Sequence, residues 1–380
     1  MPEMTQGTAE PCRVHWIRDA AALEPIEGAW RALEQRVQCR THASTFDFLA
    51  TWYRHYAGDY GGTPLIGLAW RGPDLVGVAP LMVRRGRVGR IPVTRIDFAP
   101  NDSVAGEFLA DDDQPDVVAA LVESLVHTAA FDVICLNGFD PASPQLLALH
   151  GAAAGHRLSV EMEDHAFATV NLRGGYAAYQ AGLSSHYRRN LNQKARKIAA
   201  AGFSVEGVQL TQGLDTLEAS IARMIRITEA SYKLEGRRLA DSHRGFLTDV
   251  ARRFGARGIL SLPVLSIGGR DAAFILGVVE RGCFYDITLA YDESLARLSP
   301  GAFLMQQALQ HFAGAGVHTV VSHGAHDYKK HWSTALGPQK RVFLFPPGLR
   351  AAAARFVRFG LQPLWQRLGA VRAESEHAGG

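Results

Sequence analysis

Residues 322–340, SHGAHDYKKHWSTALGPQK, concentrate side chains that can do chemistry in one short segment. The segment follows an apolar run typical of a β-strand and contains three histidines, an aspartate, a Tyr-Lys-Lys run and a tryptophan. On residue types alone it is compatible with a metal site, a phosphate-binding site, or a site that contains a general acid. The rest of the chain must decide between these three.

The amino-acid composition limits the number of domains and the kinds of partner that the protein can have. The chain has 380 residues, of which 47% are hydrophobic, and this is enough for two domains of ordinary size. Its net charge is only +3, from 40 Lys and Arg against 37 Asp and Glu, so it lacks the overall positive charge of a dedicated DNA-binding protein. Any site for an anionic partner must therefore be local.

The cysteines and the chain ends point to a reducing compartment. Cys12, Cys39, Cys135 and Cys283 lie far apart and form no CxxC pair, so we expect neither disulfides nor a zinc ribbon. The N-terminus lacks a basic flank followed by an apolar core, and no apolar run reaches the roughly 18–20 residues that a membrane span needs. We expect a cytoplasmic protein without a transmembrane segment.

An internal repeat organises the chain. Residues 64–84 and 262–280 each predict a β-hairpin, and helices precede each hairpin while a strand, a helix and a closing strand follow it. The predicted elements are helix 46–56, strand 91–98, helix 117–129 and closing strand 131–138 in the first copy, and helices 221–232 and 244–254, strand 283–290, helix 302–313 and closing strand 317–324 in the second. The two copies meet near residue 167, and only the second carries the Tyr-Lys-Lys run.

The junction ESLARLSPGA, between strand 283–290 and the following helix, favours an anion. A Pro-Gly pair at a helix start leaves main-chain N–H groups that attract phosphate. The spacing Arg297-x-x-Pro300-x-Ala302 approximates a pyrophosphate loop in which proline replaces the first glycine. We therefore name five candidate cofactor-binding residues: Arg297, Ser299, Pro300, Gly301 and Ala302. The alternative is a simple turn and helix cap.

The chain resembles the GNAT-type acyltransferase superfamily, in its branch with two tandem GNAT-like domains. The features that carry the resemblance are the hairpins, the junction LARLSPGAFLMQQAL and the segment HGAHDYKKHW. That branch includes the BioF2-like acetyltransferases, the CelD-type proteins and the FemABX-like aminoacyltransferases. The segments 184–202 and 229–238 resemble the opening of the second domain of this branch. The resemblance covers nearly the whole chain and implies an α/β (α+β) fold, with a mixed, mostly antiparallel sheet flanked by helices in each domain.

The resemblance also implies an activity. These proteins transfer an acyl group, usually from acyl-CoA, to an amine, with the pyrophosphate of the donor at a helix N-terminus. The chain departs from the pattern at His323, His326 and Pro300, where the family often has small residues or glycine. An enzyme that takes aminoacyl-tRNA as its donor would keep the same Tyr-Lys ending, so this alternative stays open.

The segment 323–332 supplies the candidate catalytic residues. Tyr328 could protonate the leaving thiolate, because a phenol with a pKa of about 10 is a competent donor. Lys329 could stabilise an oxyanion or bind a phosphate. Asp327 could orient Lys329 or a substrate amine, or cap a helix, while Lys330 is expected at the surface.

The pattern of histidines indicates an acceptor pocket and not a metal site. His323, His326 and His331 do not form a His-Glu-x-x-His pattern, and their spacing within one loop does not make ligands converge, so we expect no metal site. His323 or His326 could accept the proton of the amine, because an imidazole pKa of about 6.5 suits that task. Asp286 and Asp292 are the carboxylate alternatives as general base, and the sequence does not choose among these four residues.

Two further segments carry charge. The helix at 184–202 has five basic residues and no acidic one, so it is either a solvated face or a binding surface for phosphates or an anionic acceptor. Our candidate substrate-binding residues are Tyr187, Arg188, Asp286, Asp292 and Trp332.

The tail at 349–380 is apolar and cationic at helical spacing. It could contact a membrane surface, but Pro363 interrupts it and we favour packing against the second domain.

No GxSxG elbow, Walker loop or well-placed GxGxxG is present, which argues against serine hydrolases, P-loop NTPases and Rossmann oxidoreductases. We predict an acyltransferase that moves an acyl group, most simply acetyl, from acyl-CoA to an amine of a small molecule or of a saccharide- or peptide-linked acceptor. The predicted domains are 1–167, degenerate and acceptor-shaping; 168–348, catalytic; and 349–380, a helical tail. The alternatives are a FemABX-like enzyme using aminoacyl-tRNA and an inert ligand-binding module.

Overall fold

The computed structural model describes residues 10–37, 41–59, 61–100, 106–207, 214–234 and 236–361. Cys39, Glu235 and the end of the tail, residues 362–380 with Pro363, lie outside the described residues. The chain forms two compact units, and each draws on separate stretches of sequence. Unit 1 comprises residues 1–40, 57–164 and 340–380, and unit 2 comprises residues 41–56 and 165–339.

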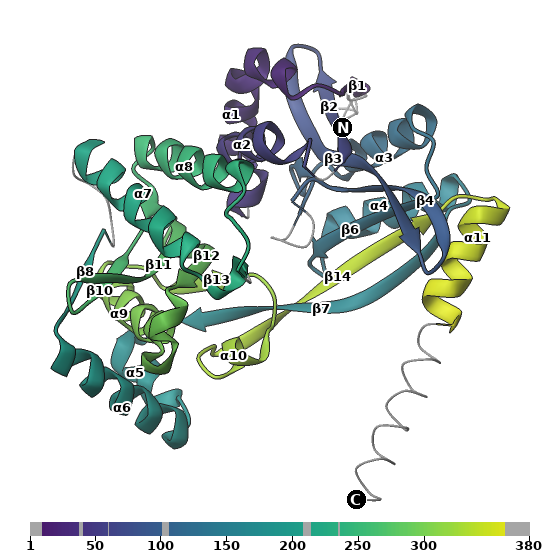
Figure 1. Ribbon diagram of the computed structural model, residues 1–380. Coiled ribbons are helices and arrows are strands. Elements are labelled where there is room, and N and C mark those ends of the chain that lie inside the picture. Colours follow the sequence, from purple (N-terminus) through teal and green to yellow (C-terminus); the bar gives the residue numbers. More distant parts are fainter. Residues whose placement is uncertain are drawn as a thin grey trace, which may run out of the picture. The chain divides into compact units, whose positions relative to one another are not determined.

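Unit 1 is a mixed sheet with helices packed on it (Figure 1). The sheet order is β1-β2-β3-β4-β6-β14, and the only parallel pair among these described strands is β4 with β6. Its elements are β1 (Arg13–Ile17), η1 (Ala20–Ile26), α1 (Glu27–Arg36), β2 (Gly62–Arg71), β3 (Asp74–Val88), β4 (Ile91–Phe98), β5 (Leu109–Ala110), α3 (Pro115–Thr128), β6 (Val133–Phe139), α4 (Pro144–Gly155), β14 (Ala335–Phe345, in part), α11 (Leu349–Arg355) and η5 (Phe356–Leu361).

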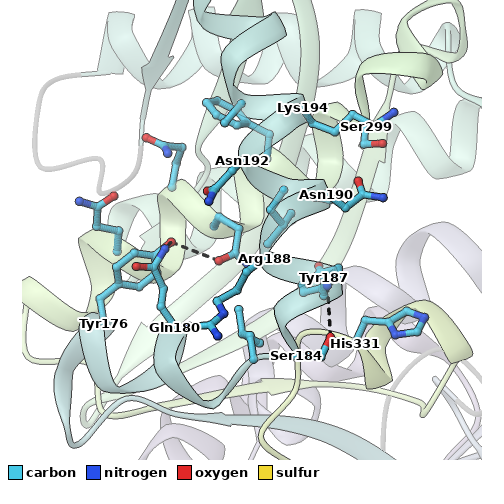
Figure 2. A pocket seen from close by; sticks show the side chains of 18 of the residues that line it. Tyr176, Gln180, Ser184, Tyr187, Arg188, Asn190, Asn192, Lys194, Ser299 and His331 are labelled. Atoms are coloured by element: carbon cyan, nitrogen blue, oxygen red, sulfur yellow. Dashed lines mark hydrogen bonds between the residues drawn. The ribbon is translucent and has the colours of Figure 1, made fainter.

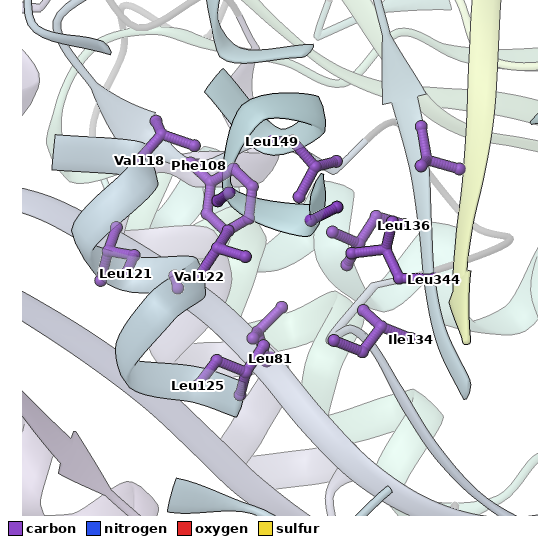
Figure 3. Close-up of a cluster of buried hydrophobic side chains, with 14 of the residues drawn as sticks. Leu81, Phe108, Val118, Leu121, Val122, Leu125, Ile134, Leu136, Leu149 and Leu344 are labelled. Atoms are coloured by element: carbon purple, nitrogen blue, oxygen red, sulfur yellow. The ribbon is translucent and has the colours of Figure 1, made fainter. Parts of the chain in front are cut away.

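The core of unit 1 lies between this sheet and the helices α3 and α4. Helix α3 buries Val118, Leu121, Val122 and Leu125, whose three- and four-residue spacing makes one apolar face. Figure 3 shows this face against sheet residues that include Leu81. Full burial of each such side chain contributes about 1.5–3 kcal/mol, so this face holds the unit together.

Unit 2 repeats the same plan. Its sheet order is β7-β13-β12-β11-β10-β8, and β12 with β13 is the only parallel pair among these described strands. Its elements are η2 (His42–Ser44), α2 (Phe46–Tyr56), β7 (Ser159–Asn171, in part), α5 (Gly175–Gly182), α6 (Ser185–Ala201), β8 (Phe203–Glu206), α7 (Leu214–Glu229), η3 (Tyr232–Leu234), α8 (Asp241–Ala256), β9 (Leu260–Ser261), β10 (Val264–Ile267), β11 (Arg270–Glu280), β12 (Cys283–Tyr291), η4 (Glu293–Leu298), α9 (Pro300–Gly314), β13 (Thr319–Ser322) and α10 (Asp327–Lys330).

The duplication predicted from the sequence is present in the topology. In unit 1 an antiparallel meander β2-β3-β4 is followed by α3 and then by β6, which lies parallel to β4. In unit 2 the meander β10-β11-β12 is followed by α9 and then by β13, which lies parallel to β12. The predicted fold class, a mixed and mostly antiparallel sheet with helices in each copy, is confirmed.

Two segments join a unit that their sequence position does not suggest. Helix α2 precedes the hairpin β2-β3 of unit 1, yet it belongs to unit 2, where it packs on α8. The tail was expected to pack against the second domain, and this is wrong for its described part. Helix α11 packs on β4 within unit 1, because Ala351 and Ala354 join an apolar cluster there (Figure 1).

Candidate active site

Strands β12 and β13 of unit 2 pair over only four residues each. The parallel register begins at Cys283 with Thr319 and ends at Asp286 with Ser322. β12 continues to Tyr291 beside β11, whereas β13 ends at Ser322. The hydroxyl of Ser322 donates a hydrogen bond of 2.5 Å to Asp286 Oδ2 at this last pair. Asp286 Oδ1 is buried and has no hydrogen-bond partner in the part of the chain that the structure describes. The main-chain edge of β12 beyond Asp286 is therefore not paired with β13.

Lys329 lies at the same end of the sheet. Its side chain is buried, with 6% of its surface exposed, and its ammonium donates a hydrogen bond to the carbonyl of His323. Burial lowers the pKa of Lys329, and the nearby Asp286 carboxylate acts against this shift. The lysine stem is directed inward from α10, although a lysine in so polar a segment is usually exposed to solvent.

His42 is a residue of this neighbourhood that the sequence analysis missed. It is 6% exposed, neither ring nitrogen has a hydrogen-bond partner among the described residues, and its ring lies against Phe48 and Tyr285. Burial, with a smaller contribution from the nearby His323, lowers the pKa of His42 to about 3. The imidazole is therefore neutral at physiological pH, and its two ring nitrogens are buried polar atoms that no described residue satisfies. No sequence motif predicts that His42 belongs to this site, because residue 42 lies far from the second copy in sequence.

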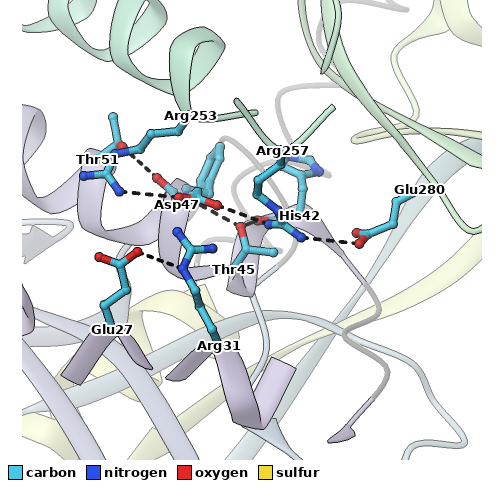
Figure 4. Close-up of polar contacts among 10 residues, drawn as sticks. Glu27, Arg31, His42, Thr45, Asp47, Thr51, Arg253, Arg257 and Glu280 are labelled. Atoms are coloured by element: carbon cyan, nitrogen blue, oxygen red, sulfur yellow. Dashed lines mark hydrogen bonds and ion pairs between the residues drawn. The ribbon is translucent and has the colours of Figure 1, made fainter. Parts of the chain in front are cut away.

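A polar network at the start of α2 fixes the position of His42 (Figure 4). The Asp47 carboxylate is buried and lies 3.4 Å from Arg253 and 3.2 Å from Arg257, both on α8 or at its end. The Thr45 hydroxyl donates a hydrogen bond of 2.7 Å to the carbonyl of His42. Because a buried carboxylate needs its cations, this network ties α2 and the turn before it to unit 2.

Lys233 and His243 extend the polar region. The ammonium of Lys233 donates a hydrogen bond of 2.6 Å to the carbonyl of Leu289 on β12. Desolvation lowers the pKa of Lys233, and Asp286 again opposes the shift. His243 Nδ1 lies 2.5 Å from the hydroxyl of Tyr56, and desolvation lowers the pKa of His243. Asp286 is thus the carboxylate that acts on both lysines.

The outer side of α10 carries the remaining candidates of the 323–332 segment. Tyr328 is 58% exposed and its ring stacks on His326 at 6.1 Å between centroids. Asp327 is exposed and pairs with Lys330 at 2.8 Å, which lowers the pKa of Asp327. The expectation that Asp327 orients Lys329 or caps the helix is wrong: it is the first helical residue, and the N-cap is His326.

The proposed cofactor-binding junction, residues 297–302, includes the expected helix start. Its turn geometry and its packing on β12 limit the room around it. Ser299 adopts a left-handed conformation with φ of 54°, and Pro300 occupies the first turn of α9. A Cβ at Gly301 would lie 2.9 Å from a methyl group of Leu289, so this glycine allows close packing of α9 on β12. Arg297 is exposed, and its carbonyl accepts a hydrogen bond of 2.6 Å from Lys194. Asp292 caps η4 and pairs with Arg270 at 3.2 Å, so it has a structural role there.

A pocket of about 1010 Å³ lies between α6 and α9 of unit 2 (Figure 2). It is lined at one end by Lys194 and Ser299, and at the other by Tyr187 and His331, whose rings stack at 5.8 Å. Arg188 and Ala302 also line it. The pocket thus joins Ser299, Ala302, Tyr187 and Arg188 from our candidate set, whereas Arg297, Pro300 and Gly301 are not among its lining residues.

Two aromatic candidates have distinct environments. Burial raises the pKa of Tyr187 to about 12. Trp332 is buried in the core of unit 2, and its carbonyl accepts a hydrogen bond of 2.9 Å from the Tyr179 hydroxyl. Because its ring contributes to the core, Trp332 positions the segment after α10.

The described residues contain no group of three or more His, Cys, Asp or Glu residues arranged to hold a metal ion. Among the helices built from these residues, none combines the length and the hydropathy needed to cross a membrane.

Comparison with known proteins supports the family resemblance of unit 2. Residues 185–330 match the family described as acetyltransferase (GNAT) domain. The comparison with curated proteins gave no match. The segment 185–330 is therefore similar to GNAT-type acetyltransferase domains, in agreement with the resemblance seen in the sequence.

Solved structures share the fold over most of the chain. The C-terminal domain of a protein assigned as lysylphosphatidylglycerol synthetase from Agrobacterium fabrum has a TM-score of 0.52 at 14% identity, covering 88% of this chain and 94% of that one. FemX has a TM-score of 0.54 at 11% identity, covering 87% and 98%. L-PGS from Bacillus licheniformis has a TM-score of 0.51 at 11% identity, covering 93% and 99%. At these identities the likeness establishes the fold.

Proposed function

We propose that the protein is an N-acyltransferase that takes its acyl group from acyl-CoA, and that the chemistry takes place in unit 2. The observation that carries the proposal is the pocket between α6 and α9. It combines the first turn of α9, at Ser299 and Ala302, with the cations of Arg188 and Lys194. Helix N-termini and basic side chains both favour phosphates, and about 1010 Å³ is ample for a cofactor-sized ligand.

The part of β12 beyond Asp286, which β13 does not pair, supports the placement of the acyl end. His331 lines the pocket two residues after Lys329, so the pocket reaches the segment that carries the buried ammonium. In the proposed arrangement the pantetheine lies along β12 beyond Asp286, and the thioester carbonyl lies at Lys329. An ammonium has three N–H groups, and the bond to the His323 carbonyl uses one, which leaves two for an oxyanion.

The proposed reaction is attack of a neutral amine on the thioester carbonyl. The new C–N bond forms a tetrahedral oxyanion held by Lys329, and collapse breaks the C–S bond. The thiolate takes a proton from Tyr328, and the amine gives its proton to Asp286. Asp286 is the better of the two carboxylates because Asp292 is engaged in capping η4 and in its pair with Arg270. His42 is a poor proton acceptor, because its pKa is about 3.

The acceptor is proposed to be an amine of a small molecule or of a saccharide- or peptide-linked substrate. Asp286 Oδ1 and both ring nitrogens of His42 are buried polar atoms without partners among the residues of the described ranges. Such atoms suit an acceptor that carries several hydrogen-bonding groups. The first copy lacks a counterpart of the Tyr-Lys-Lys run, so we propose a role for it in acceptor selection.

Aminoacyl-tRNA is the second candidate donor, and α6 favours it. The helix has five basic residues and no acidic one, and Arg188, Arg189, Arg196 and Lys197 are exposed. Such a surface suits a phosphate backbone as well as it suits a single cofactor.

A thermal-shift panel of acyl-CoAs tests the donor. A ligand present at 100 times its dissociation constant stabilises the folded state by about 2.7 kcal/mol, which is easily measured. We expect stabilisation by acetyl-CoA or a longer acyl-CoA. Binding of aminoacyl-tRNA without any stabilisation by acyl-CoAs would contradict the proposal and favour the second donor.

A further inference from the structure

Helix α11 of unit 1 is apolar on the side that faces solvent. Its inner side packs through Ala351 and Ala354. On the outer side Leu349 is 92% exposed, and Phe356, which follows α11 as the first residue of η5, is 62% exposed. Phe356 keeps a helical backbone conformation, and residues seven positions apart lie on the same side of a helix. Ala352 and Ala353 are also exposed. A surface helix normally presents polar residues to water, so this outer face is suited to a partner.

Ion pairs hold the helix in this orientation. Arg355 pairs with Glu161 at 2.7 Å, Arg358 pairs with Glu163, and Arg350 lies 3.8 Å from Asp132. All of these residues belong to unit 1. These three arginines are thus neutralised by neighbouring carboxylates, and their ion pairs oppose a rotation that would turn the apolar side of the helix inward.

The hairpin tip next to this helix is strongly cationic. Arg85, Arg87 and Arg90 are exposed at the β3-β4 turn, and the sequence from 75 to 96 contains no acidic residue. No carboxylate lies within ion-pair distance of these three arginines among the described residues. The tip lies against η5, since a Cβ on Gly89 would lie 3.0 Å from Val357. The three arginines with Leu349 and Phe356 are called the tail surface below.

We propose that the tail surface docks the protein peripherally on a membrane that contains anionic phospholipids. Leu349 and Phe356 would enter the boundary between headgroups and acyl chains, and the three arginines would lie against the phosphates. A second copy of the chain is a poorer partner. A two-fold dimer through this surface would bring two unpaired arginine tips to the same interface.

Vesicle flotation of the full chain tests this proposal. We compare vesicles of phosphatidylcholine alone with vesicles of phosphatidylcholine mixed with phosphatidylglycerol, at low and at high salt. We expect the wild type to float with the anionic vesicles only and to be released by salt. Each arginine near an anionic surface contributes about 1 kcal/mol, or about fivefold, so the triple variant Arg85→Gln, Arg87→Gln, Arg90→Gln should lose about a hundredfold in partitioning.

Matched control variants distinguish membrane binding through the tail surface from nonspecific effects of positive charge and of exposed apolar residues. Phe356→Ser should weaken partitioning about tenfold or more, because a buried Phe contributes about 1.5–3 kcal/mol. Leu147→Ser removes a similarly exposed apolar residue from α4, and the triple Arg157→Gln, Arg173→Gln, Arg281→Gln removes the same charge elsewhere; both should partition like the wild type.

Three results would overturn the proposal: no flotation of the wild type, equal losses in the control variants, or a wild-type dimer in size-exclusion chromatography that Phe356→Ser converts to a monomer. The last result would assign the surface to a second copy. Donor binding in unit 2 is expected to be unchanged in all of these variants.

Discussion

The ammonium of Lys329 donates a hydrogen bond to the main-chain carbonyl of His323, the residue that follows the end of β13. This bond closes the segment between β13 and α10 and places a buried cation beside the carboxylate of Asp286. It gives Lys329 both a structural and a proposed chemical role, and the two can be separated by mutation.

Lys329→Met keeps the apolar stem and removes the charge. If the ammonium stabilises the oxyanion, turnover should fall about a hundredfold, equivalent to roughly 3 kcal/mol. The loss of the donor to the His323 carbonyl should also lower the free energy of unfolding by about 1–3 kcal/mol. Steady-state kinetics and urea unfolding measure the two effects separately.

Lys330→Met is the matched control for this variant. Lys330 is exposed, and its one ion-pair partner among the described residues is the exposed Asp327. Turnover should therefore stay within a factor of about two of the wild type, and the free energy of unfolding should hardly change. Equal turnover in Lys329→Met and the wild type would remove Lys329 from the chemistry and leave it as a structural residue.

Tyr328→Phe removes a hydroxyl from a ring that is largely exposed and stacked on His326. The ring keeps its stacking, so the fold and the affinity for the donor should not change. If the hydroxyl protonates the leaving thiolate, the maximal rate should fall about 10²-fold or more. A fall in donor affinity with an unchanged maximal rate would contradict the acid role and indicate a binding contact.

His42 should make the stability of unit 2 depend on pH. Its pKa is about 3 in the folded protein and about 6.5 in the unfolded chain. Below pH 6.5 the unfolded state binds a proton that the folded state does not, so stability falls as the pH is lowered from 6.5 toward 3. Between pH 7 and pH 5 this residue alone should cost about 2 kcal/mol.

The variant His42→Phe isolates this effect, because the aromatic ring still packs against Phe48 and Tyr285. Urea unfolding at pH 7 and pH 5 should give a smaller difference between the two pH values in the variant than in the wild type. The same pH dependence in both proteins would mean that His42 titrates normally.

Lys194→Met should weaken the binding of an acyl-CoA by about tenfold, because it removes a charged contact worth about 1.4 kcal/mol. Lys194 lines the pocket and also bonds to the carbonyl of Arg297, so both the cation and the position of the loop change. Lys197→Met, on the same helix but outside the pocket lining, is the control. Calorimetry should detect a loss in the first variant only, and equal losses in both would indicate a diffuse electrostatic effect.

The sequence predicted those parts of the structure that depend on local patterns. Strand β4 and helix α2 have the predicted bounds, and the basic helix 184–202 is α6 within one residue at each end. These segments have strong periodicity and clear turn signals at their ends, and such signals act within a few residues. The duplication followed from the same patterns repeated at a distance.

Long-range packing produced the features that the sequence did not predict. The assignment of α2 to unit 2 depends on the ion pairs of Asp47 with Arg253 and Arg257, about two hundred residues away in sequence. His42 and Lys233 joined the site for the same reason. The burial of Lys329 depends on the way four residues of α10 lie on the sheet, and no periodicity can be read from so short a helix.

The most direct test of the proposed acyltransferase activity is acyl transfer by the purified full chain from isotope-labelled acetyl-CoA to a panel of amines, followed by mass spectrometry. The account predicts an amide product that carries the label, release of one free thiol per product, and an approximately hundredfold lower rate in Lys329→Met. It would be contradicted by label transfer at the wild-type rate in Lys329→Met, or by transfer from aminoacyl-tRNA with none from any acyl-CoA.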